Sequence, residues 1–242
     1  MSPSRVSFVI DEVEVEGEPG QTIIDAADAA GIYIPRLCHK PGLEPYGACR
    51  LCTVTANGRS CSACTQPIAP GMIVQNETEK LRDFRKSLVE MLLVEGNHFC
   101  MFCERSGDCE LQALAYRLGV TAPRFPYLFP QEREVDASHP DILIDHNRCI
   151  LCARCVRTSR DIDQKQVFDF VGRGPHKRIA IRTGTRLADS EADVTDDAVD
   201  ACPVGALLRK RVGFRSPIGT RRYDHAPIGT DIEARAPKPE GS

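Results

Sequence analysis

The stretch Cys149-Ile150-Leu151-Cys152-Ala153-Arg154-Cys155 decides how the C-terminal part of this chain folds. Three thiolates at positions i, i+3 and i+6 are typical of a [4Fe-4S] binding run, because they can wrap three corners of a cubane. The fourth corner is expected from a distant cysteine followed by proline, which Cys202-Pro203 supplies. Zinc also binds thiolates, but this spacing favours the cubane.

A ferredoxin with two cubanes would carry a second set of four ligands, and here that set is missing. The cysteine expected four residues after Cys155 is replaced by Ser159. Counting back from Cys202 with the same spacing leads to Ala198, Thr195 and Ala192. The sequence therefore predicts a two-[4Fe-4S]-ferredoxin-like domain over 140–212 that retains one cluster. Its ligands are Cys149, Cys152, Cys155 and Cys202.

Another group of cysteines lies near the N-terminus, in the order Cys38-x10-Cys49-x2-Cys52 followed by Cys61-x2-Cys64. One ligand before a tight pair and one after it can hold the two irons of a [2Fe-2S] cluster, as in plant-type ferredoxins. The two pairs alone could instead bind zinc, but that leaves Cys38 without a role. Five cysteines are present for four positions, and spacing does not choose between Cys61 and Cys64.

The sequence around this group predicts a plant-type ferredoxin domain over 1–77. Apolar and polar residues alternate over 5–16, as in a hairpin, and a short helix is expected over 23–30. Further strands are expected at 53–55 and 72–74. The predicted order, two strands followed by a helix and then by cysteine loops, is that of a β-grasp fold.

A third group, His98-x-Cys100-x2-Cys103-x5-Cys109, belongs to a small helical domain expected over 78–139. The helix before it should begin at the cap Thr78, stop at Gly96, and bury a face formed by Leu81, Phe84, Leu88, Met91 and Leu92. Another helix is expected over 110–118. Three thiolates and an imidazole can bind a [4Fe-4S] cubane or one zinc ion, and His98 could also be a mere hydrogen-bond donor.

Composition narrows the class of protein. The chain has 242 residues, 12 cysteines and a net charge of −3, which gives no electrostatic case for binding nucleic acid. No apolar run approaches the roughly 18 residues of a membrane span, and no signal-peptide region is visible. We expect a soluble cytoplasmic protein of α+β class whose cysteines bind metal or do redox chemistry. The proline-containing tail, 213–242, is expected to be extended against a partner or disordered.

No nucleotide-binding loop and no catalytic constellation stands out in the sequence. Zinc sites do not change redox state, whereas several iron–sulfur clusters in series conduct single electrons. The chain is therefore predicted to carry electrons rather than to catalyse a reaction by itself.

The order of the three sites resembles the N-terminal module of the large iron–sulfur subunit of respiratory complex I and of [FeFe]-hydrogenases. The whole chain resembles the diaphorase iron–sulfur subunit (gamma, or U) of bidirectional NAD-reducing [NiFe]-hydrogenases. The agreement lies in Gly96-Asn97-His98-Phe99-Cys100, Ser106-Gly107-Asp108-Cys109-Glu110-Leu111-Gln112 and Pro217-Ile218-Gly219.

The resemblance implies which residues hold each cluster. The [2Fe-2S] ligands would be Cys38, Cys49, Cys52 and Cys64, which leaves Cys61 spare. The second site would use His98, Cys100, Cys103 and Cys109. One departure matters, because the broader module places its histidine where this sequence has Gly96. Either the loop is re-routed so that His98 reaches iron, or that ligand has been replaced.

The resemblance also implies a function. The chain would hold one [2Fe-2S] and two [4Fe-4S] clusters as a non-catalytic electron-transfer subunit of an enzyme complex. FMN, NAD and the Ni-Fe site would belong to partners: a flavoprotein diaphorase subunit and the small and large subunits of a [NiFe]-hydrogenase, which together interconvert H2 + NAD+ and H+ + NADH. An NAD-dependent formate dehydrogenase, an NADP-reducing [FeFe]-hydrogenase or a complex I-like NADH dehydrogenase could use the same module. A zinc-stabilised scaffold protein is the alternative of a different class.

Overall fold

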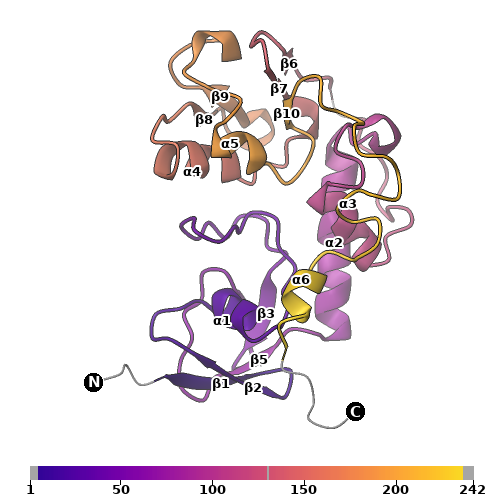
Figure 1. The fold of residues 1–242 in the computed structure, drawn as a ribbon. Helices are drawn as coiled ribbons and strands as arrows, with labels where there is room; N and C mark the ends of the chain where they lie inside the picture. The colour runs from indigo at the N-terminus through magenta and orange to yellow at the C-terminus, as the bar shows by residue number, and fades with distance from the viewer. Residues whose placement is uncertain (1–4, 130, 237–242) are drawn as a thin grey trace.

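In the computed structural model, which describes residues 5–129 and 131–236, the chain folds into three units. Figure 1 shows the N-terminal unit at the bottom, the C-terminal unit at the top, and helix α2 (Glu79–Glu95) on the right between them. Among the described residues, no helix is both long and apolar enough to span a membrane.

The first unit is a five-stranded sheet with one helix packed on it. Its elements are β1 (Val6–Ile10), β2 (Val13–Gly17), α1 (Ile23–Ala29), β3 (Thr53–Ala56), β4 (Arg59–Ser62) and β5 (Ile73–Gln75). The strand order is β2-β1-β5-β3-β4, with β1 and β5 parallel and the other neighbours antiparallel. Phe8, Ile10, Ile23 and Ile24 form a core with almost no exposed surface. The hairpin, the helix and two strands agree with the prediction, whereas the short polar β4 was not predicted.

Helix α2 begins after Thr78, whose side chain accepts a hydrogen bond from the backbone N–H of Leu81, and ends at Gly96, as predicted. The predicted buried face is wrong in part. Phe84 and Met91 are each more than one-third exposed. Among the residues buried in their place are two charged ones, Arg85 and Glu90.

The side chain of Arg85 explains why α2 buries a face that differs from the predicted one. It is completely buried and donates hydrogen bonds to the backbone carbonyls of Leu51 (3.1 Å), Thr53 (3.0 Å) and Asn76 (3.0 Å) and to Oδ1 of Asn76 (2.6 Å). Two of these carbonyls flank Cys52. The periodicity of apolar residues cannot predict this contact, because the buried side chain is a charged arginine, a residue type that is mostly exposed.

The middle and C-terminal units follow α2. Their remaining helices are η1 (Cys100–Phe102), α3 (Glu110–Arg117), η2 (His146–Arg148), α4 (Arg154–Asp161), η3 (Gly174–His176), η4 (Leu187–Asp189) and α5 (Asp197–Asp200). The strands are β6 (Val135–Asp136), β7 (Ile142–Asp145), β8 (Phe168–Val171), β9 (Arg178–Ile181) and β10 (Leu207–Arg209). They form one sheet of order β10-β7-β6 and one hairpin, β8-β9.

Three of the four positions of the missing second ligand set lie in the core of the C-terminal unit, and the fourth, Thr195, is exposed. Ala192, Ala198 and Ser159 are buried, and the two alanines pack in one apolar cluster with side chains such as Leu187. The hydroxyl oxygen of Ser159 accepts a hydrogen bond from the backbone N–H of Val167 (2.9 Å). Apolar packing therefore occupies the buried positions, which supports the prediction that this unit retains one cluster.

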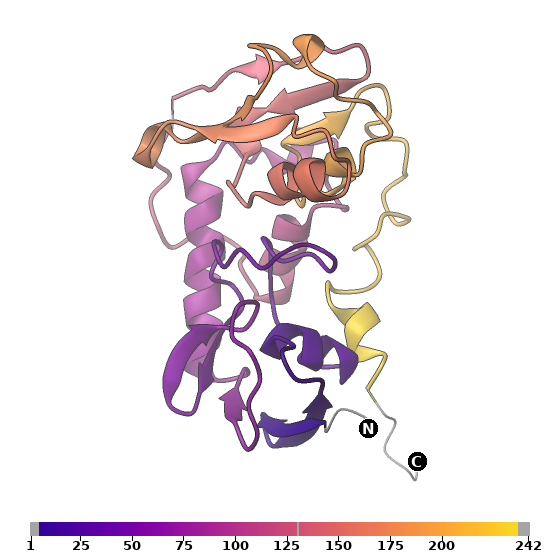
Figure 2. The same cartoon turned by 90° about the vertical axis from the view of Figure 1, so that its left-hand side faces the viewer.

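The described part of the tail, 213–236, is ordered and packs on its own chain, so the expectation of disorder is wrong for this part. Residues 237–242 lie outside the described residues, and contact of the tail with a partner stays a prediction. Figures 1 and 2 show the yellow segment running from the top unit down to the first, where it ends in α6 (Thr230–Glu233). The N–H of Tyr223 donates to the carbonyl of Gly107 (3.0 Å), and Arg117 bonds both the carbonyl of Ile228 (2.8 Å) and Glu233. These polar contacts, together with Ile228 in the apolar core, hold the tail without the apolar periodicity on which the prediction relied.

We expect Arg85→Leu to destabilise the chain by about 3 kcal/mol, because it leaves several buried carbonyls without a donor. Arg82→Leu on the same helix is the matched control, since that side chain is 64% exposed. It should cost no more than roughly 0.5 kcal/mol. Thermal unfolding followed by circular dichroism measures both, and equal melting temperatures for the two variants would contradict the role of Arg85.

Candidate metal centres

The first ligand set comes together in the loops that flank β3 and β4. The N–H of Cys38 points at Sγ of Cys49 (3.4 Å), and the N–H of Cys49 points at Sγ of Cys38 (3.5 Å). Hydrogen bonds from the thiols of Cys49 and Cys64 hold the pKa of Cys38 well below its ordinary value, and Cys64 also bonds Cys52. The structure thus gathers the four thiols that the resemblance assigns to the [2Fe-2S] site.

Cys61, the fifth cysteine of this region, lies apart from the four. It is in β4, where it pairs with Val54. Burial raises the pKa of its thiol, and Cys52 is the one cysteine that contributes to the shift. Cys64, two residues after Ser62 at the end of the strand, lies with the other three instead. The unpredicted strand β4 therefore separates two cysteines that spacing alone could not distinguish.

The second ligand set surrounds the start of α3. Cys100 opens η1, and Cys109 is the N-cap residue of α3. Burial, followed by the nearby thiols of Cys103 and Cys100, raises the pKa of Cys109 to about 12. The structure therefore brings these three cysteines together.

The ring of His98 lies where a side chain of residue 96 would be. A Cβ added to Gly96 would be 2.5 Å from Nε2 of His98, so only glycine leaves room for the ring. Burial and the nearby Arg148 lower the pKa of His98 to about 4, which keeps the imidazole in the neutral form that ligates metals. Arg148 also donates to Sγ of Cys103 (3.6 Å). Arg148 is thus a common neighbour of His98 and Cys103, and ligation of a cluster by His98 stays a prediction.

The third ligand set is assembled at the start of α4 and the end of α5. Burial raises the pKa of Cys149 to about 11 and of Cys152 to about 12, and in both cases Cys202 adds to the shift. Burial and all three of these thiols raise the pKa of Cys155 as well. Four thiols held together in a buried site would carry an unfavourable charge as free thiolates, and metal binding removes their protons.

The backbone inside the cysteine loops is strained. Leu151 (φ 53°) and Ala153 (φ 59°), within the third set, and Arg50 (φ 58°), within the first, have left-handed conformations that residues with a Cβ seldom adopt. Such conformations persist where the surroundings impose them, often at functional sites. They let the chain turn between closely spaced cysteines.

No three His, Cys, Asp or Glu side chains within 5–129 and 131–236 converge closely enough to hold one metal ion. A cluster differs from a single ion because its ligands bind different irons.

Arginines from the third set join it to the other two. Arg157 donates to the backbone carbonyl of Cys38 (2.5 Å), and Arg154 donates to that of His39 (2.8 Å). Arg148 reaches the second set through Cys103. Figure 2 shows the loop of the first set, in purple, directly below α4. The sequence analysis did not single out these arginines, although three cationic residues within and beside one thiolate run are a signal that could have found them.

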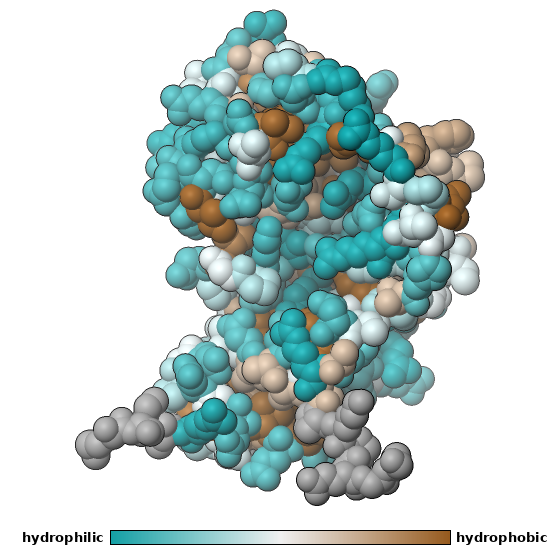
Figure 3. Space-filling view, viewed as in Figure 1, coloured by the Kyte–Doolittle hydropathy of each residue, from teal (hydrophilic) through white to brown (hydrophobic). Residues whose placement is uncertain are grey.

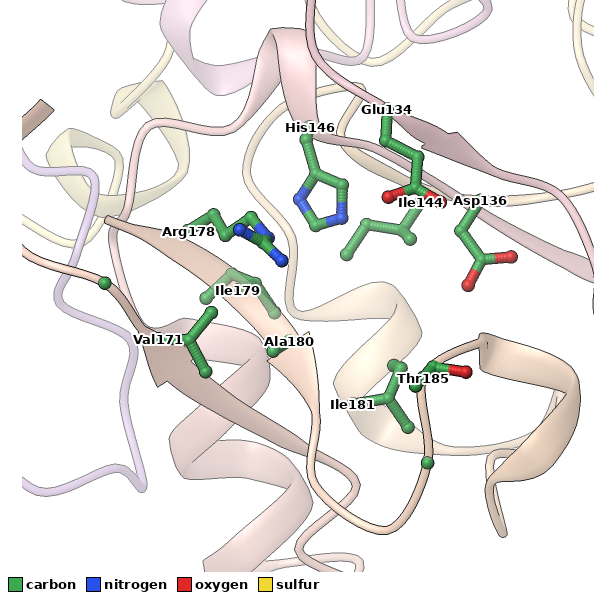
Figure 4. Close-up of a pocket in the computed structure, with 12 residues that line it drawn as sticks. Glu134, Asp136, Ile144, His146, Val171, Arg178, Ile179, Ala180, Ile181 and Thr185 are labelled. Carbon is green, nitrogen blue, oxygen red and sulfur yellow. The ribbon is translucent and has the colours of Figure 1, made fainter. Parts of the chain in front are cut away.

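A cavity of about 410 Å³ lies elsewhere in the C-terminal unit. Figure 4 shows it between side chains of β7 and β9, with His146 near its middle and Arg178 beside it. Of the described residues that line this cavity, none is a cysteine, so it is separate from the ligand sets.

Three family models match successive parts of the chain. They describe a 2Fe-2S iron-sulfur cluster binding domain (residues 4–79), an NADH-ubiquinone oxidoreductase-G iron-sulfur binding region (85–124) and the ferredoxin-like domain of NADH-quinone oxidoreductase subunit 3 (139–208). Fold and site therefore define an iron–sulfur protein with [2Fe-2S]- and [4Fe-4S]-type domains.

Relatives narrow this class further. The gamma subunit of the NAD-reducing hydrogenase HoxS of Cupriavidus necator is 41% identical over 221 residues, which are 90% of this chain and 93% of that subunit. A chain in the crystal structure of an NAD+-reducing [NiFe]-hydrogenase in the H2-reduced state is 47% identical with a TM-score of 0.91, covering 96% of this chain and 98% of that one. The mitochondrial NADH-ubiquinone oxidoreductase 78 kDa subunit of Candida albicans is 33% identical, but the match spans only 30% of its length. The chain belongs to the family of gamma subunits of NAD-reducing hydrogenases, which confirms the resemblance.

We expect Cys64→Ser to remove or strongly disturb the [2Fe-2S] signal, and Cys61→Ser to leave it intact, because only Cys64 lies among the other three thiols. Electron paramagnetic resonance (EPR) of the reduced full chain measures both. The two variants are matched controls, since each replaces one sulfur by oxygen in the same short segment. Loss of the signal in Cys61→Ser alone would reverse the assignment.

We expect His98→Cys to keep a cubane at lower potential, because a thiolate adds one negative charge, and His98→Ala to lose the cubane or convert it to a three-iron form. Gly96→Ala should perturb the same signal, since its methyl group would occupy the place of the ring. Redox-poised EPR measures all three. An unchanged spectrum and midpoint in both His98 variants would mean that His98 is only a neighbour.

Proposed function

We propose that this chain is the iron–sulfur electron-transfer subunit of an NAD-reducing hydrogenase. It relays electrons between a [NiFe]-hydrogenase module and an FMN/NAD diaphorase module, whose overall reaction is H2 + NAD+ = H+ + NADH. The observation that carries the proposal is the match over 93% of the length of a hydrogenase gamma subunit, compared with 30% of a complex I relative.

The three ligand sets support one [2Fe-2S] cluster and two [4Fe-4S] clusters, which would supply one-electron steps. Cys38, Cys49, Cys52 and Cys64 would hold the first of these. His98, Cys100, Cys103 and Cys109 would hold the second, and Cys149, Cys152, Cys155 and Cys202 the third. We assign them to domains at 1–77, 78–139 and 140–212, followed by the tail 213–242.

The chain's own residues keep these sets at fixed separations. Buried arginines bond the third set to the loops of the first and second, and α2 is fastened to the first unit through Arg85. Rigid placement suits electron transfer, because little reorganisation is needed when the electron moves. None of the twelve cysteines, all of which lie in the described part of the chain, forms a disulfide, which fits a reducing compartment, and we propose the cytoplasm.

An apolar surface beside the second set fits contact with a partner. Phe99, Met101 and Phe102 are each more than 60% exposed, and Phe214 and Ile218 of the tail are exposed as strongly. Met101 lies against the two tail residues around one hollow. Figure 3 shows apolar surface at the upper right, where Figure 1 has the loop before α3 and the start of the tail. We propose that one of the partner subunits covers it.

We expect the purified full chain to contain about ten irons (2 + 4 + 4) with matching acid-labile sulfide, and to reduce no NAD+ with H2 by itself. The complex reconstituted with its flavoprotein and [NiFe] subunits should do so. Metal analysis and a spectrophotometric assay measure the two properties. Stoichiometric zinc without sulfide would overturn the proposal, and a molybdenum-containing partner would replace the hydrogenase by a formate dehydrogenase.

A further inference from the structure

Arg157, on α4, is a buried cation with unusual partners. The residue is 4% exposed, and its guanidinium donates to the backbone carbonyls of Cys38 (2.5 Å), Glu44 (2.5 Å) and Ala153 (3.3 Å). The group also lies over the ring of Tyr46, 5.3 Å from its centre. In the part of the chain that the structure describes, no Asp or Glu forms a salt bridge with it.

Among the described residues, this arrangement leaves a buried charge with no carboxylate in hydrogen-bond contact, and Asp161, which feels its charge, is itself paired with Arg160. Arginine stays protonated in proteins, and a buried charge is costly unless an opposite charge lies near it. Carbonyl oxygens satisfy the N–H groups but remove none of the net charge. Arg154, one turn earlier, is held differently, because Glu110 binds it through both carboxylate oxygens (2.7 and 2.8 Å). Of these two arginines, only Arg154 is bound by a carboxylate in the described part of the chain.

Cysteines of two ligand sets lie near enough to Arg157 to act on its charge, and so does Asp161, one turn later on the same helix. Burial lowers the pKa of Arg157, and the groups that oppose this effect most are Cys38, of the first set, and then Cys152, of the third. No cysteine of the second set contributes noticeably. The second cationic group facing it, Arg154, disfavours its charge.

We infer that Arg157 is the shared counter-charge of the first and third cluster sites and raises the reduction potential of both, that of the [2Fe-2S] site most. This inference rests on the proposed function, because it needs clusters at these cysteines. Four thiolates leave either cluster with net negative charge, and reduction adds one electron more. A fixed positive charge beside the site stabilises the reduced form over the oxidised form, and net charge and hydrogen bonding are known determinants of cluster potential.

Because Arg157 lies on α4, it is close to both the first and the third cluster site. It follows Cys155 by two residues on the same short helix, so the helix that carries part of the third set also places the guanidinium against the carbonyl of Cys38. The bond to Glu44 fixes the other side of the same loop. Arg157 is therefore a positioning residue for the first site as well as a source of charge.

The experiment compares Arg157→Gln with Arg157→Lys by redox-poised EPR of the full chain in its complex. Arg157→Gln removes the charge and should lower the midpoint of the [2Fe-2S] cluster, lower that of the third-site cubane less, and leave the second-site cubane unchanged. Arg157→Lys keeps the charge and should restore most of the lost potential. Arg160→Gln is the matched control, since Arg160 lies on the same helix, is exposed and is paired with Asp161.

Each outcome decides the inference. Equal [2Fe-2S] midpoints in Arg157→Gln and Arg160→Gln, with all clusters present, would overturn it and leave the proposed function intact. Absence of iron–sulfur signals from the parent chain would instead overturn the proposed function. Where Arg157→Gln fails to assemble the first cluster, Arg157→Lys decides. Assembly restored by lysine supports the counter-charge, and failure of lysine as well would mean that the guanidinium acts only through its hydrogen bonds.

Discussion

The structure depends on satisfying the backbone carbonyls of the buried cysteine loops. Loops that turn between closely spaced cysteines form no helix or sheet, so their carbonyls need donors from elsewhere. Arginine provides several N–H groups in one planar fork and reaches far from its own backbone. Arg85, Arg154 and Arg157 perform this role from helices of neighbouring units. The contacts that complete each loop are therefore the contacts that join the units, and ligand placement and overall architecture have a common cause.

The same constraint explains which parts of the fold could be predicted from sequence. The first hairpin, α1 and the ends of α2 are local features, and alternation or a capping residue such as Thr78 specifies them. The buried face of α2 is set by carbonyls near Cys52, about thirty residues away in the chain, so apolar periodicity pointed to Phe84 and Met91 instead. The expectation of a disordered tail was wrong for residues 213–236 for a related reason. Long-range hydrogen bonds such as that of Arg117 to Ile228 leave no local pattern in the sequence.

Prediction of the site divides in the same way. Spacing identified all three cysteine groups, because ligands of one cluster must lie on short loops, but it could not separate Cys61 from Cys64 without knowledge of β4. The shifted histidine is the reverse case. Sequence alone left open whether His98 replaces a ligand at 96, and the structure adds that the ring of His98 fills space that a side chain at 96 would need. The relation between Gly96, which has no side chain, and the shifted His98 is visible only in the three-dimensional structure.

The lost second cubane gives the third unit its place in the proposed electron path. Replacing ligands by small residues would leave a void, and a void costs stability in proportion to its size. Here Ala192 and Ala198 lie within a packed apolar cluster that includes Leu187, so the far side of the unit is closed by core rather than by a second redox centre. The sides that remain are those where Arg157 contacts the first set and Arg148 the second. In the proposed path, a single cluster in this unit would connect to both neighbouring ligand sets, and the arginines beside its cysteines lie at both connections.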